Sequence, residues 1–295
     1  MKAIILAGGT GSRLYPLTQI SSKQLQAVFD KPMVYYPLTV LLASGIKELC
    51  LISTPHDLPR YKNLLGDGKQ WGVSIEYREQ PKPEGIAQAF LIAGDFIGSD
   101  NVILMLGDNI LSGGNDFPQA VSTFSDGATV FAYHVKDPQR YGVVEFDRAG
   151  KAISIEEKPQ RPKSSYAVPG VYIYDNAVLD IAKNIKPSAR GELEITDVNL
   201  DYLKQGKLLV HRLSRGFAWL DAGTSTALHE ASSYIEAIER RQGIKIGCPE
   251  EAALVRGFIT IDQFQALIKN MPVCEYSDYL RGVADEWHRL QGDGQ

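Results

Sequence analysis

The first thirty residues constrain the fold more than any other stretch, because an apolar segment runs directly into a glycine-rich loop. Residues 2–7 read KAIILA, which predicts a short buried strand, and residues 8–13 read GGTGSR. Glycine lets backbone N–H groups approach phosphate oxygens, since no Cβ stands in the way. Arg13 and Lys23 add positive charge beside this loop. The stretch therefore predicts a triphosphate-binding loop at the end of a first strand.

This loop matches neither of two common phosphate-binding motifs. It lacks the spacing Gly-x-x-x-x-Gly-Lys-Ser/Thr, and it lacks Gly-x-Gly-x-x-Gly with an acidic residue about 20 positions later. For the glycines at positions 8, 9 and 11 alone, a surface turn is an equally good interpretation. Arg13, Lys23 and the segment 30–32 (DKP) favour nucleotide binding.

These residues resemble the N-terminal signature of the sugar-phosphate nucleotidylyltransferases. The resemblance extends from Lys2 to about Ile246, most of the chain. It departs at one point, because family members usually read KQLLP after the loop, whereas residues 23–27 read KQLQA here. That change removes no charged group and no base-reading group. The resemblance implies that the loop wraps a nucleoside triphosphate and that Arg13 and Lys23 hold its phosphates.

Composition sets broad limits on partners. The 295 residues suffice for one large α/β domain with an appendage, and a net charge of −4 favours neither nucleic acid nor an anionic membrane as a partner. Cys50, Cys248 and Cys274 are scattered, which predicts buried thiols rather than a zinc site or disulfides. No signal peptide and no run of about 20 apolar residues is found, so we expect a cytoplasmic protein.

Strand and helix signals alternate in the first part of the chain. Such β-α-β units predict parallel strands with right-handed crossovers. The expected fold class is α/β, a Rossmann-like mixed, mostly parallel sheet flanked by helices, as in GT-A-like nucleotidyltransferases. The expected strands are 2–7, 48–53, 74–78 and 101–106, and the expected helices are 33–43, 61–65 and 85–93.

Strands predominate after residue 127. We expect strands over 128–135, 168–174 and 208–213, a hairpin formed by 142–147 and 152–156, and helices over 176–183 and 197–205. A further helix ends near Gly243 and buries Leu228, Ala231, Ile235 and Ile238.

The expected organisation is a catalytic domain followed by an appendage. The domain spans 1–246 and consists of a nucleotide-binding half (1–127) and a sugar-phosphate-binding half (128–246). The second half contains a small sugar-binding β region that is expected to lie over the first half. The appendage (247–295) consists of small helices, with a frayed tail from His288.

Asp108 and Asp221 are the candidate metal ligands. Each ends an apolar stretch, where a lone Asp is most often a turn or cap residue. Mg²⁺ prefers oxygen ligands and usually binds one or two carboxylates together with substrate phosphates. The matching family residues hold the metal, so the resemblance implies Mg²⁺ as the cofactor at Asp108 and Asp221.

A second charged cluster lies at Glu156-Glu157-Lys158-Pro159, which as a charge run would be a solvated edge. A phosphate nucleophile repels a triphosphate, so the chemistry needs a cation between them. The resemblance implies that Glu157 binds sugar hydroxyls and that Lys158 and Arg190 hold the sugar phosphate. It places further residues around the sugar: Tyr141, Gly142, Val168, Tyr172 and Trp219.

Two glutamines are candidates for reading the base. An amide offers a donor and an acceptor, which suits the imide edge of thymine or uracil. The family uses the residue matching Gln80 for this purpose, with Gly85 close by. The resemblance thus implies the following nucleotide-binding residues: Gly8, Gly9, Thr10, Gly11, Ser12, Arg13, Lys23, Gln24, Gln80, Gly85 and Asp108.

Within the family the chain resembles most the branch that uses dTTP. That resemblance implies direct in-line transfer of a thymidylyl group from dTTP to α-D-glucose 1-phosphate, giving dTDP-glucose and pyrophosphate, as the first step toward dTDP-rhamnose and other deoxysugars. Arg13, Lys158, Asp108 and Asp221 are the implied catalytic residues. The five histidines form no spaced pair and no Ser-His-Asp arrangement is visible, which fits a reaction without a covalent enzyme intermediate.

Two alternatives remain open at this point. One is a UTP-dependent uridylyltransferase on the same fold, and the other is a non-catalytic nucleotide-sugar-binding subunit. The family also forms homotetramers. In the appendage the apolar residues Phe258, Ile259, Leu267 and Ile268 are expected to need a partner surface.

Overall fold

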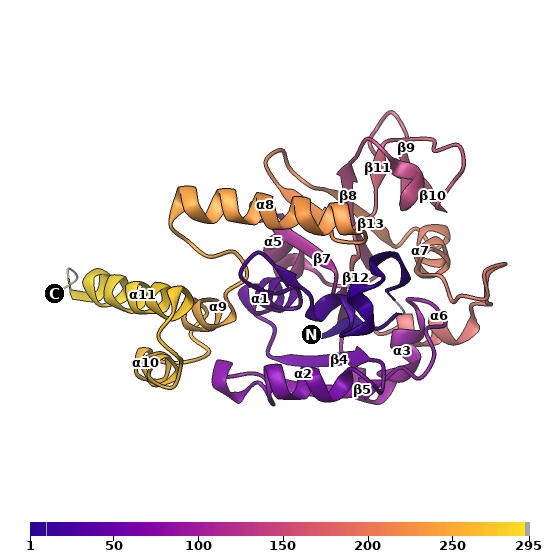
Figure 1. The fold of residues 1–295 in the computed structure, drawn as a ribbon. Helices are drawn as coiled ribbons and strands as arrows, with labels where there is room; N and C mark the ends of the chain where they lie inside the picture. Colours follow the sequence, from indigo (N-terminus) through magenta and orange to yellow (C-terminus); the bar gives the residue numbers. More distant parts are fainter. Residues whose placement is uncertain (10, 293–295) are drawn as a thin grey trace.

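A ten-stranded mixed sheet forms the centre of the computed structural model, which describes residues 1–9 and 11–292 (Figure 1). Four neighbouring strands run parallel in the order β6-β1-β4-β5, and each coincides, to within one residue, with a segment expected to be a strand. They are β1 (Lys2–Ala7), β4 (Glu48–Ser53), β5 (Ser74–Glu79) and β6 (Val102–Leu106).

The sheet continues beyond β6 into the second half of the chain, so one sheet joins both halves. β12 pairs antiparallel with β6 and β8, the hairpin of β9 and β10 is confirmed, and β13 pairs parallel with β8. The fold class is thus confirmed as α/β with a mixed sheet. These strands are β8 (Ala128–His134), β9 (Gly142–Phe146), β10 (Ala152–Glu157), β11 (Tyr166–Ala167), β12 (Val171–Tyr174) and β13 (Leu208–Arg212).

Two details of the strand prediction are wrong. The expected strand 168–174 begins only at Val171, as β12, because Pro169 has no N–H to donate and Gly170 turns its N–H to the side chain of Asn109; a separate short strand, β11, precedes it. A two-stranded sheet of β7 (Asn109–Ser112) and β14 (Ala218–Asp221) was not predicted. A second small sheet pairs β2 (Ala27–Val28) with β3 (Lys31–Pro32).

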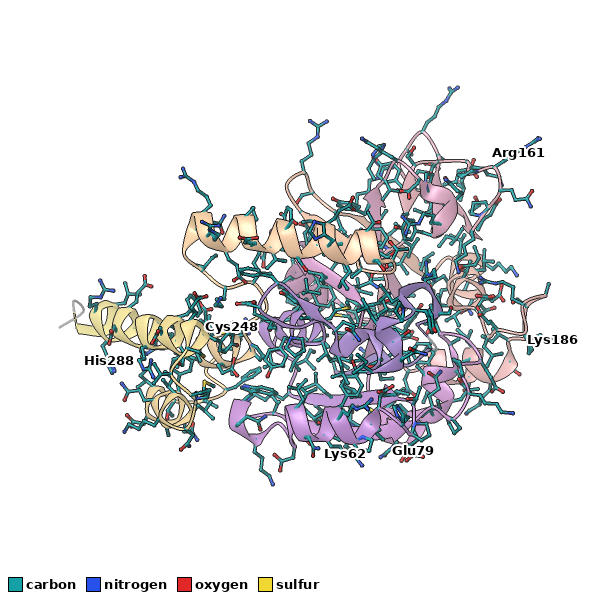
Figure 2. All side chains as sticks on the ribbon, viewed as in Figure 1. Lys62, Glu79, Arg161, Lys186, Cys248 and His288 are labelled. Atoms are coloured by element: carbon teal, nitrogen blue, oxygen red, sulfur yellow. The ribbon has the colours of Figure 1, made fainter. Side chains whose placement is uncertain are left out.

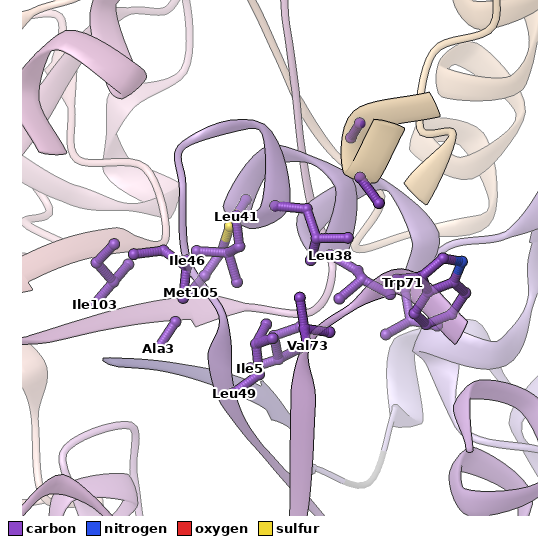
Figure 3. Close-up of a cluster of buried hydrophobic side chains, with 14 of the residues drawn as sticks. Ala3, Ile5, Leu38, Leu41, Ile46, Leu49, Trp71, Val73, Ile103 and Met105 are labelled. Atoms are coloured by element: carbon purple, nitrogen blue, oxygen red, sulfur yellow. The ribbon is translucent and has the colours of Figure 1, made fainter. Parts of the chain in front are cut away.

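Apolar cores lie on both faces of the sheet. Successive residues of β1 point to opposite faces, so Ile5 joins the core under α1 (Tyr35–Ala43) while Ile4 joins the core on the other face. Figure 3 shows the first core, with Leu38 and Leu41 of α1 packed over Ile5. The other helices before α8 are α2 (Leu58–Leu65), α3 (Gln88–Ile92), α4 (Gly94–Ile97), α5 (Asp116–Thr123), α6 (Val178–Asn184) and α7 (Ile195–Lys204).

Helix α8 (Ser225–Gln242) crosses the upper part of the molecule in the view of Figure 1. It begins where the Thr224 hydroxyl accepts a hydrogen bond from the Ala227 N–H, and it ends at Gly243, whose left-handed backbone suits glycine. Ala231 and Ile235 are buried, as predicted, in a third apolar cluster. This cluster anchors α8 to the segment that follows the glycine-rich loop.

The C-terminal helices share the main core rather than forming one of their own. They lie to one side of the sheet, and Cys248 marks the junction (Figures 1 and 2). Gly72 lies against the Phe258 carbonyl, where a Cβ would come within 2.3 Å of that oxygen, so the helices approach closely. These helices are α9 (Pro249–Val255), α10 (Ile261–Lys269) and α11 (Glu275–Gly292).

Three expectations about the appendage are wrong. Ile259 and Ile268 are buried, and Phe258 and Leu267 pack on the same core, so these residues do not need a partner surface. α11 is as long as α8, at 18 residues, and includes His288, so no frayed tail begins there; residues 293–295 lie outside the described part. Cys50 and Cys248 are buried as predicted, but Cys274 is exposed. Among the described residues no helix has the length and apolar character to cross a membrane.

Candidate active site

The carboxyl ends of the parallel strands meet at one edge of the sheet. There the Gly107 N–H donates to the Leu6 carbonyl at 2.9 Å, and the Gln80 N–H donates to the Ser53 carbonyl at 2.7 Å. The glycine-rich loop, Gln80 and Asp108 follow three of these strands. Open α/β sheets bind ligands at this edge.

Three adjoining cavities lie along this edge, and Asp108 lines all of them. The glycine-loop cavity is about 220 Å³, the glutamine cavity about 210 Å³ and the aromatic cavity about 470 Å³. Each is named after the predicted residues that line it: Gly8, Gly9, Gly11, Ser12, Arg13, Lys23 and Gln24 for the first; Gly8, Gly9, Gln24, Gln80, Gly85, Glu157, Lys158 and Arg190 for the second; and Arg13, Tyr141, Gly142, Glu157, Lys158, Val168, Tyr172, Trp219 and Asp221 for the third.

The structure thus brings nearly all of the predicted residues together, while their individual roles stay predictions. Thr10 lies outside the described residues. Arg190 is the one residue predicted for the sugar side that does not line the aromatic cavity. None of the five histidines lines any of the three cavities.

Asp108 is held between a cation and an amide. The Lys23 ammonium donates to Oδ2 of Asp108, and the Asn109 Nδ2 donates to Oδ1 at 2.9 Å. Burial pushes the pKa of Asp108 upward, but the charge and hydrogen bond of Lys23 outweigh it, so the pKa lies below its usual range. Asp108 is therefore ionised and fixed in orientation.

Asn109 orients that carboxylate, and the sequence prediction missed it. Its Oδ1 accepts hydrogen bonds from Trp219 Nε1 at 2.6 Å and from the Gly170 N–H at 2.9 Å. Both partners are donors, so the other end of the amide, Nδ2, must face Asp108. Trp219, predicted to contact the sugar, is largely buried and holds Asn109 in place. The position of Asn109 directly after Asp108 was the signal in the sequence that could have indicated this role.

The small sheet of β7 and β14 delivers Asp221 to the same place. Its register pairs Asp221 with Asn109, next to Asp108 in the chain. Burial, and then the negative charge of Asp108, raise the pKa of Asp221 above its usual range. Tyr141 donates to Asp221 at 3.4 Å, and the Arg140 guanidinium lies 3.5 Å away. Arg140 also lines the aromatic cavity and was not predicted.

Asp108 and Asp221 are the two carboxylates predicted to hold a metal ion at this edge. Within residues 1–9 and 11–292 no group of three or more His, Cys, Asp or Glu side chains could hold one. Asp108 and Asp221 nevertheless fit Mg²⁺, which usually binds one or two carboxylates and takes its other ligands from water and substrate phosphates. The mutual repulsion seen at Asp221 is what a cation there would relieve.

Glu157 and Lys158 lie where β10 ends, between the glutamine and aromatic cavities. Thr196, buried at the start of α7, donates to Glu157 Oε2 at 2.6 Å; it is another residue that sequence reasoning missed. Lys158 has a left-handed backbone, with φ of 41°, which is strained for a residue with a Cβ. Such strain often occurs at functional positions.

Arg190 is engaged by carboxylates. Its guanidinium donates to both oxygens of Glu194, at 2.8 and 2.9 Å, and lies 3.5 Å from Glu157 and from Glu192. Binding a sugar phosphate would require this arginine to exchange at least one of these partners. The role predicted for Arg190 therefore stays a prediction.

Gln80 carries an unusual oxygen. Among the described residues, its Oε1 is the one buried side-chain nitrogen or oxygen without a hydrogen-bond partner. It lies beside Gly8, where a Cβ would come within 1.9 Å of it, so only glycine fits. A buried acceptor without a donor is unfavourable, which marks a place where a ligand N–H can bind.

Gly85 shapes the same cavity. Its φ is 110°, and a Cβ there would come within 2.4 Å of the backbone of Leu193. The segment beside it is tied to that residue, because the Leu193 N–H donates to the Glu84 carbonyl at 2.7 Å and the Ala87 N–H donates to the Leu193 carbonyl at 3.1 Å. This pairing explains why the helix expected from residue 85 begins only at Gln88.

A family model described as "Nucleotidyl transferase" matches residues 2–238. The chain belongs to the nucleotidyl transferase family. It is 53% identical over 283 residues to the glucose-1-phosphate thymidylyltransferase of Neisseria meningitidis serogroup A, covering 95% of this chain and 98% of that one. It is also 53% identical to the enzyme of that name from Mycolicibacterium smegmatis, covering 97% and 99%.

Two solved structures share the fold of this chain. A Bacillus anthracis structure, described as a candidate glucose-1-phosphate thymidylyltransferase with bound sucrose, has a TM-score of 0.74 at 45% identity, over 79% of this chain and 94% of that one. A UDP-glucose pyrophosphorylase with bound UDP-glucose has a TM-score of 0.71 over 82% and 99%. At 22% identity the second structure supports the fold alone.

Proposed function

We propose that this chain transfers a thymidylyl group from dTTP to α-D-glucose 1-phosphate, giving dTDP-glucose and pyrophosphate. The observation that carries the proposal is the meeting of three cavities at Asp108, one with a glycine loop and two cations, one with an unpartnered amide oxygen and one with aromatic and acidic side chains. Relatives of the same name at 53% identity over nearly the whole chain support it.

The reaction is a direct in-line displacement. An oxygen of the sugar phosphate attacks the α-phosphorus of dTTP, forming a new P–O bond, while the bond to the β-phosphate oxygen breaks and pyrophosphate leaves with that electron pair. No side chain needs to bond covalently to the substrate. The protein contributes by positioning two anions that repel each other and by neutralising their charge.

The cations of the site lie where that charge develops. Arg13 and Lys23 line the glycine-loop cavity, where they hold the triphosphate and stabilise the leaving pyrophosphate. Lys158 lies between the other two cavities, where it holds the attacking phosphate, with Arg190 nearby. Mg²⁺, held by Asp108 and Asp221, would supply further charge neutralisation at the α-phosphate.

The glutamine cavity is suited to bind a pyrimidine base that carries an imide N–H. Gln80 Oε1 offers an acceptor, and both thymine and uracil carry an N3–H donor, whereas cytosine has a lone pair at N3. UTP is therefore a second candidate donor. We expect dTTP and UTP both to serve, with dTTP preferred.

A pyrophosphate-release assay with glucose 1-phosphate tests this proposal. Turnover with dTTP above UTP is the expected result, with little turnover for ATP or GTP. Comparable rates with the purine nucleotides would contradict the proposal that the glutamine cavity binds the base. Absence of release with every nucleotide at saturating Mg²⁺ would favour a non-catalytic nucleotide-sugar-binding subunit.

Assembly, location and pathway complete the proposal. We place the protein in the cytoplasm as a homotetramer at the first step of dTDP-rhamnose and deoxysugar formation, on the family resemblance. Exposed apolar side chains remain in the C-terminal region, with Val255 at the end of α9 62% exposed and Val273 in the loop between α10 and α11 84% exposed, and they are the candidate contacts. Light scattering that gives a monomer mass at micromolar concentration would contradict the tetramer.

A further inference from the structure

The structure assigns a positioning role to Gln88, a residue that lines none of the three cavities. We propose that Gln88 fixes the amide of Gln80 with its oxygen toward the base, and that it thereby sets the preference for bases with an N–H at this edge. This inference rests on the proposed function, because it concerns how the same cavity selects its nucleotide.

The orientation of Gln88 is determined by its neighbour Glu84. The Glu84 backbone N–H, which can only donate, contacts Gln88 Oε1 at 3.1 Å. The Glu84 carboxylate, which when ionised only accepts, takes a hydrogen bond from Gln88 Nε2 at 2.9 Å. With the amide reversed, both contacts would be lost, so the oxygen of Gln88 must point inward.

The orientation of Gln80 follows from that of Gln88. Gln88 Oε1 accepts a second hydrogen bond, from Gln80 Nε2, at 2.7 Å. If the Gln80 amide were reversed, two oxygens would face each other at that distance. One N–H of the Gln80 amide is therefore engaged inside the protein, and the buried Oε1 of this cavity-lining residue is left without a donor.

The ligand that satisfies this oxygen must bring an N–H. Oε1 is shielded beside Gly8, so the loop backbone has to yield as a base enters; a Cβ at Gly9 would meet nothing within 4 Å, which leaves room for that movement. Thymine and uracil supply the donor at N3. Cytosine presents a lone pair there, and two facing acceptors repel, so the relay from Glu84 through Gln88 to Gln80 rejects it.

The test compares Gln88→Leu with Gln88→Glu, by kcat/KM for dTTP and for dCTP. Leu removes the acceptor and frees the Gln80 amide to turn, so the dTTP preference over dCTP should fall at least about tenfold, the scale of one buried unpaired group. Gln88→Glu is made together with Glu84→Gln, so that its second oxygen receives an N–H instead of facing a carboxylate; it keeps an acceptor toward Gln80 and should keep most of the preference. The change should appear mainly in KM for the nucleotide, with KM for the sugar phosphate unchanged.

Gln205→Leu is the matched control, since Gln205 is an exposed glutamine that bonds the residue four positions earlier, Asp201, at 2.8 Å, as Gln88 bonds Glu84. It should leave the preference intact. Where dCTP turnover is too slow to measure, its inhibition constant against dTTP gives the same comparison. An unchanged preference in Gln88→Leu, or an equal loss in both Gln88 variants, would overturn the inference. A wild-type protein inactive with dTTP would instead overturn the proposed function.

Discussion

Two buried lysines from the same N-terminal segment have different surroundings. Lys31 lies in a cluster that we name the clasp, made of Asp30, Lys31, Glu239 and Lys245. Lys23 lies at the active-site edge, paired with Asp108. Both lysines are more than nine-tenths buried, so burial alone does not tell a structural charge from a functional one.

The clasp is balanced. Its two cations and two carboxylates contact one another, with Lys31 Nζ 3.0 Å from Glu239 Oε1 and Lys245 Nζ 3.1 Å from Glu239 Oε2. The Ile246 N–H also donates to Glu239, at 2.8 Å. These contacts join α8 to the segment after the glycine-rich loop and to the start of the C-terminal helices. Because each charged group of the clasp is paired with another, the clasp stabilises the fold and presents no unpaired charge to a ligand.

At the active-site edge the charges and hydrogen-bonding groups are not fully paired. The pKa of Asp221 is raised by burial and by Asp108, Gln80 keeps an acceptor without a donor, and Lys158 has a strained backbone. Each of these features costs stability in the chain described here. Incomplete pairing, rather than burial, therefore distinguishes the edge at which substrate and metal are predicted to bind.

The clasp should show the largest effect on stability. Glu239→Ala leaves two lysines to share Asp30, so the free energy of unfolding should fall by about 3 kcal/mol, the scale of breaking a buried ion pair. Turnover of the molecules that remain folded should change little, because Glu239 lines none of the three cavities. Urea unfolding together with the pyrophosphate assay measures both.

Glu236→Ala is the control on the same helix. Glu236 forms an exposed pair with Arg240 at 3.1 Å, and such pairs contribute about 0.5 kcal/mol or less. Equal losses of stability for the two variants would show that the clasp is no more than a surface ion pair.

The aspartates of the active-site edge should show their largest effect on turnover. Asp108→Asn and Asp221→Asn should each lose at least ~100-fold in turnover, about 2.7 kcal/mol of barrier. Asp221→Asn should keep a near-normal Tm, whereas Asp108→Asn also leaves the buried Lys23 without its carboxylate and should lower the Tm. The reason for the loss of turnover is that each substitution preserves the shape of the side chain and removes a charge that is proposed to bind Mg²⁺ and so to support the reaction of the substrates. Turnover against Mg²⁺ concentration is the deciding measurement.

Asp147→Asn provides the matched control, because Asp147 is a strand-end aspartate whose carboxylate caps the turn between β9 and β10, accepting from Ala149 and Lys151 at 2.9 Å each. It should lose some stability and no turnover. The Asp108/Asp221 double variant should be little worse than either single one, since the pair acts as a unit. Wild-type rates for both single variants at saturating Mg²⁺ would make these aspartates turn residues too.

The sequence predicted the active-site edge better than the contacts within it. The glycine-rich loop, Gln80 and Asp108 follow separate apolar segments, and parallel pairing necessarily brings such strand ends to one edge. Asp221 was placed there by resemblance, and the structure gives the reason in the pairing of β7 with β14. That pairing could not be predicted, because both strands are short and more than a hundred residues separate them.

The residues that were missed act through other side chains. Asn109, Thr196 and Gln88 each orient a predicted residue by a hydrogen bond at 2.6 to 2.9 Å. Sequence patterns indicate which side chains have the right chemistry, but these bonds depend on angles set by packing. The apolar faces of the C-terminal helices were misread for a related reason, since a sequence does not show whether the chain itself covers them.

A smaller effect on stability is expected from the left-handed backbone of Lys158. Lys158→Gly relieves the left-handed backbone, whereas Lys158→Ala keeps it, so the glycine variant should be more stable than the alanine variant by up to about 1 kcal/mol. Both variants lose the cation and should lose turnover alike. At Lys151, whose backbone is not left-handed, glycine should be the less stable of the two. The same order at both positions would remove the case for strain at the active-site edge.

The smallest expected effect is a pH dependence of the clasp. Burial raises the pKa of Asp30, but hydrogen bonds from Lys245 and Lys31 outweigh it, so the folded pKa lies below the ordinary value of 3.8. A lowered folded pKa stabilises the fold fully above the unfolded pKa, and the contribution is lost as the pH falls through the folded pKa. The stability difference between wild type and Asp30→Asn should therefore be constant from about pH 7 to pH 5 and should shrink below about pH 4.

Asp67→Asn separates this effect from that of an exposed pair. The pKa of Asp67 is also lowered, by a hydrogen bond from Lys69, but this pair is solvent-exposed and should be screened by about 0.5 M salt. The Asp30 difference, measured by urea unfolding at the same salt, should persist because Lys31 and Lys245 are largely buried. If salt removed both differences equally, the clasp would behave as a surface pair, and the contrast between its balanced charges and those of the active-site edge would fail.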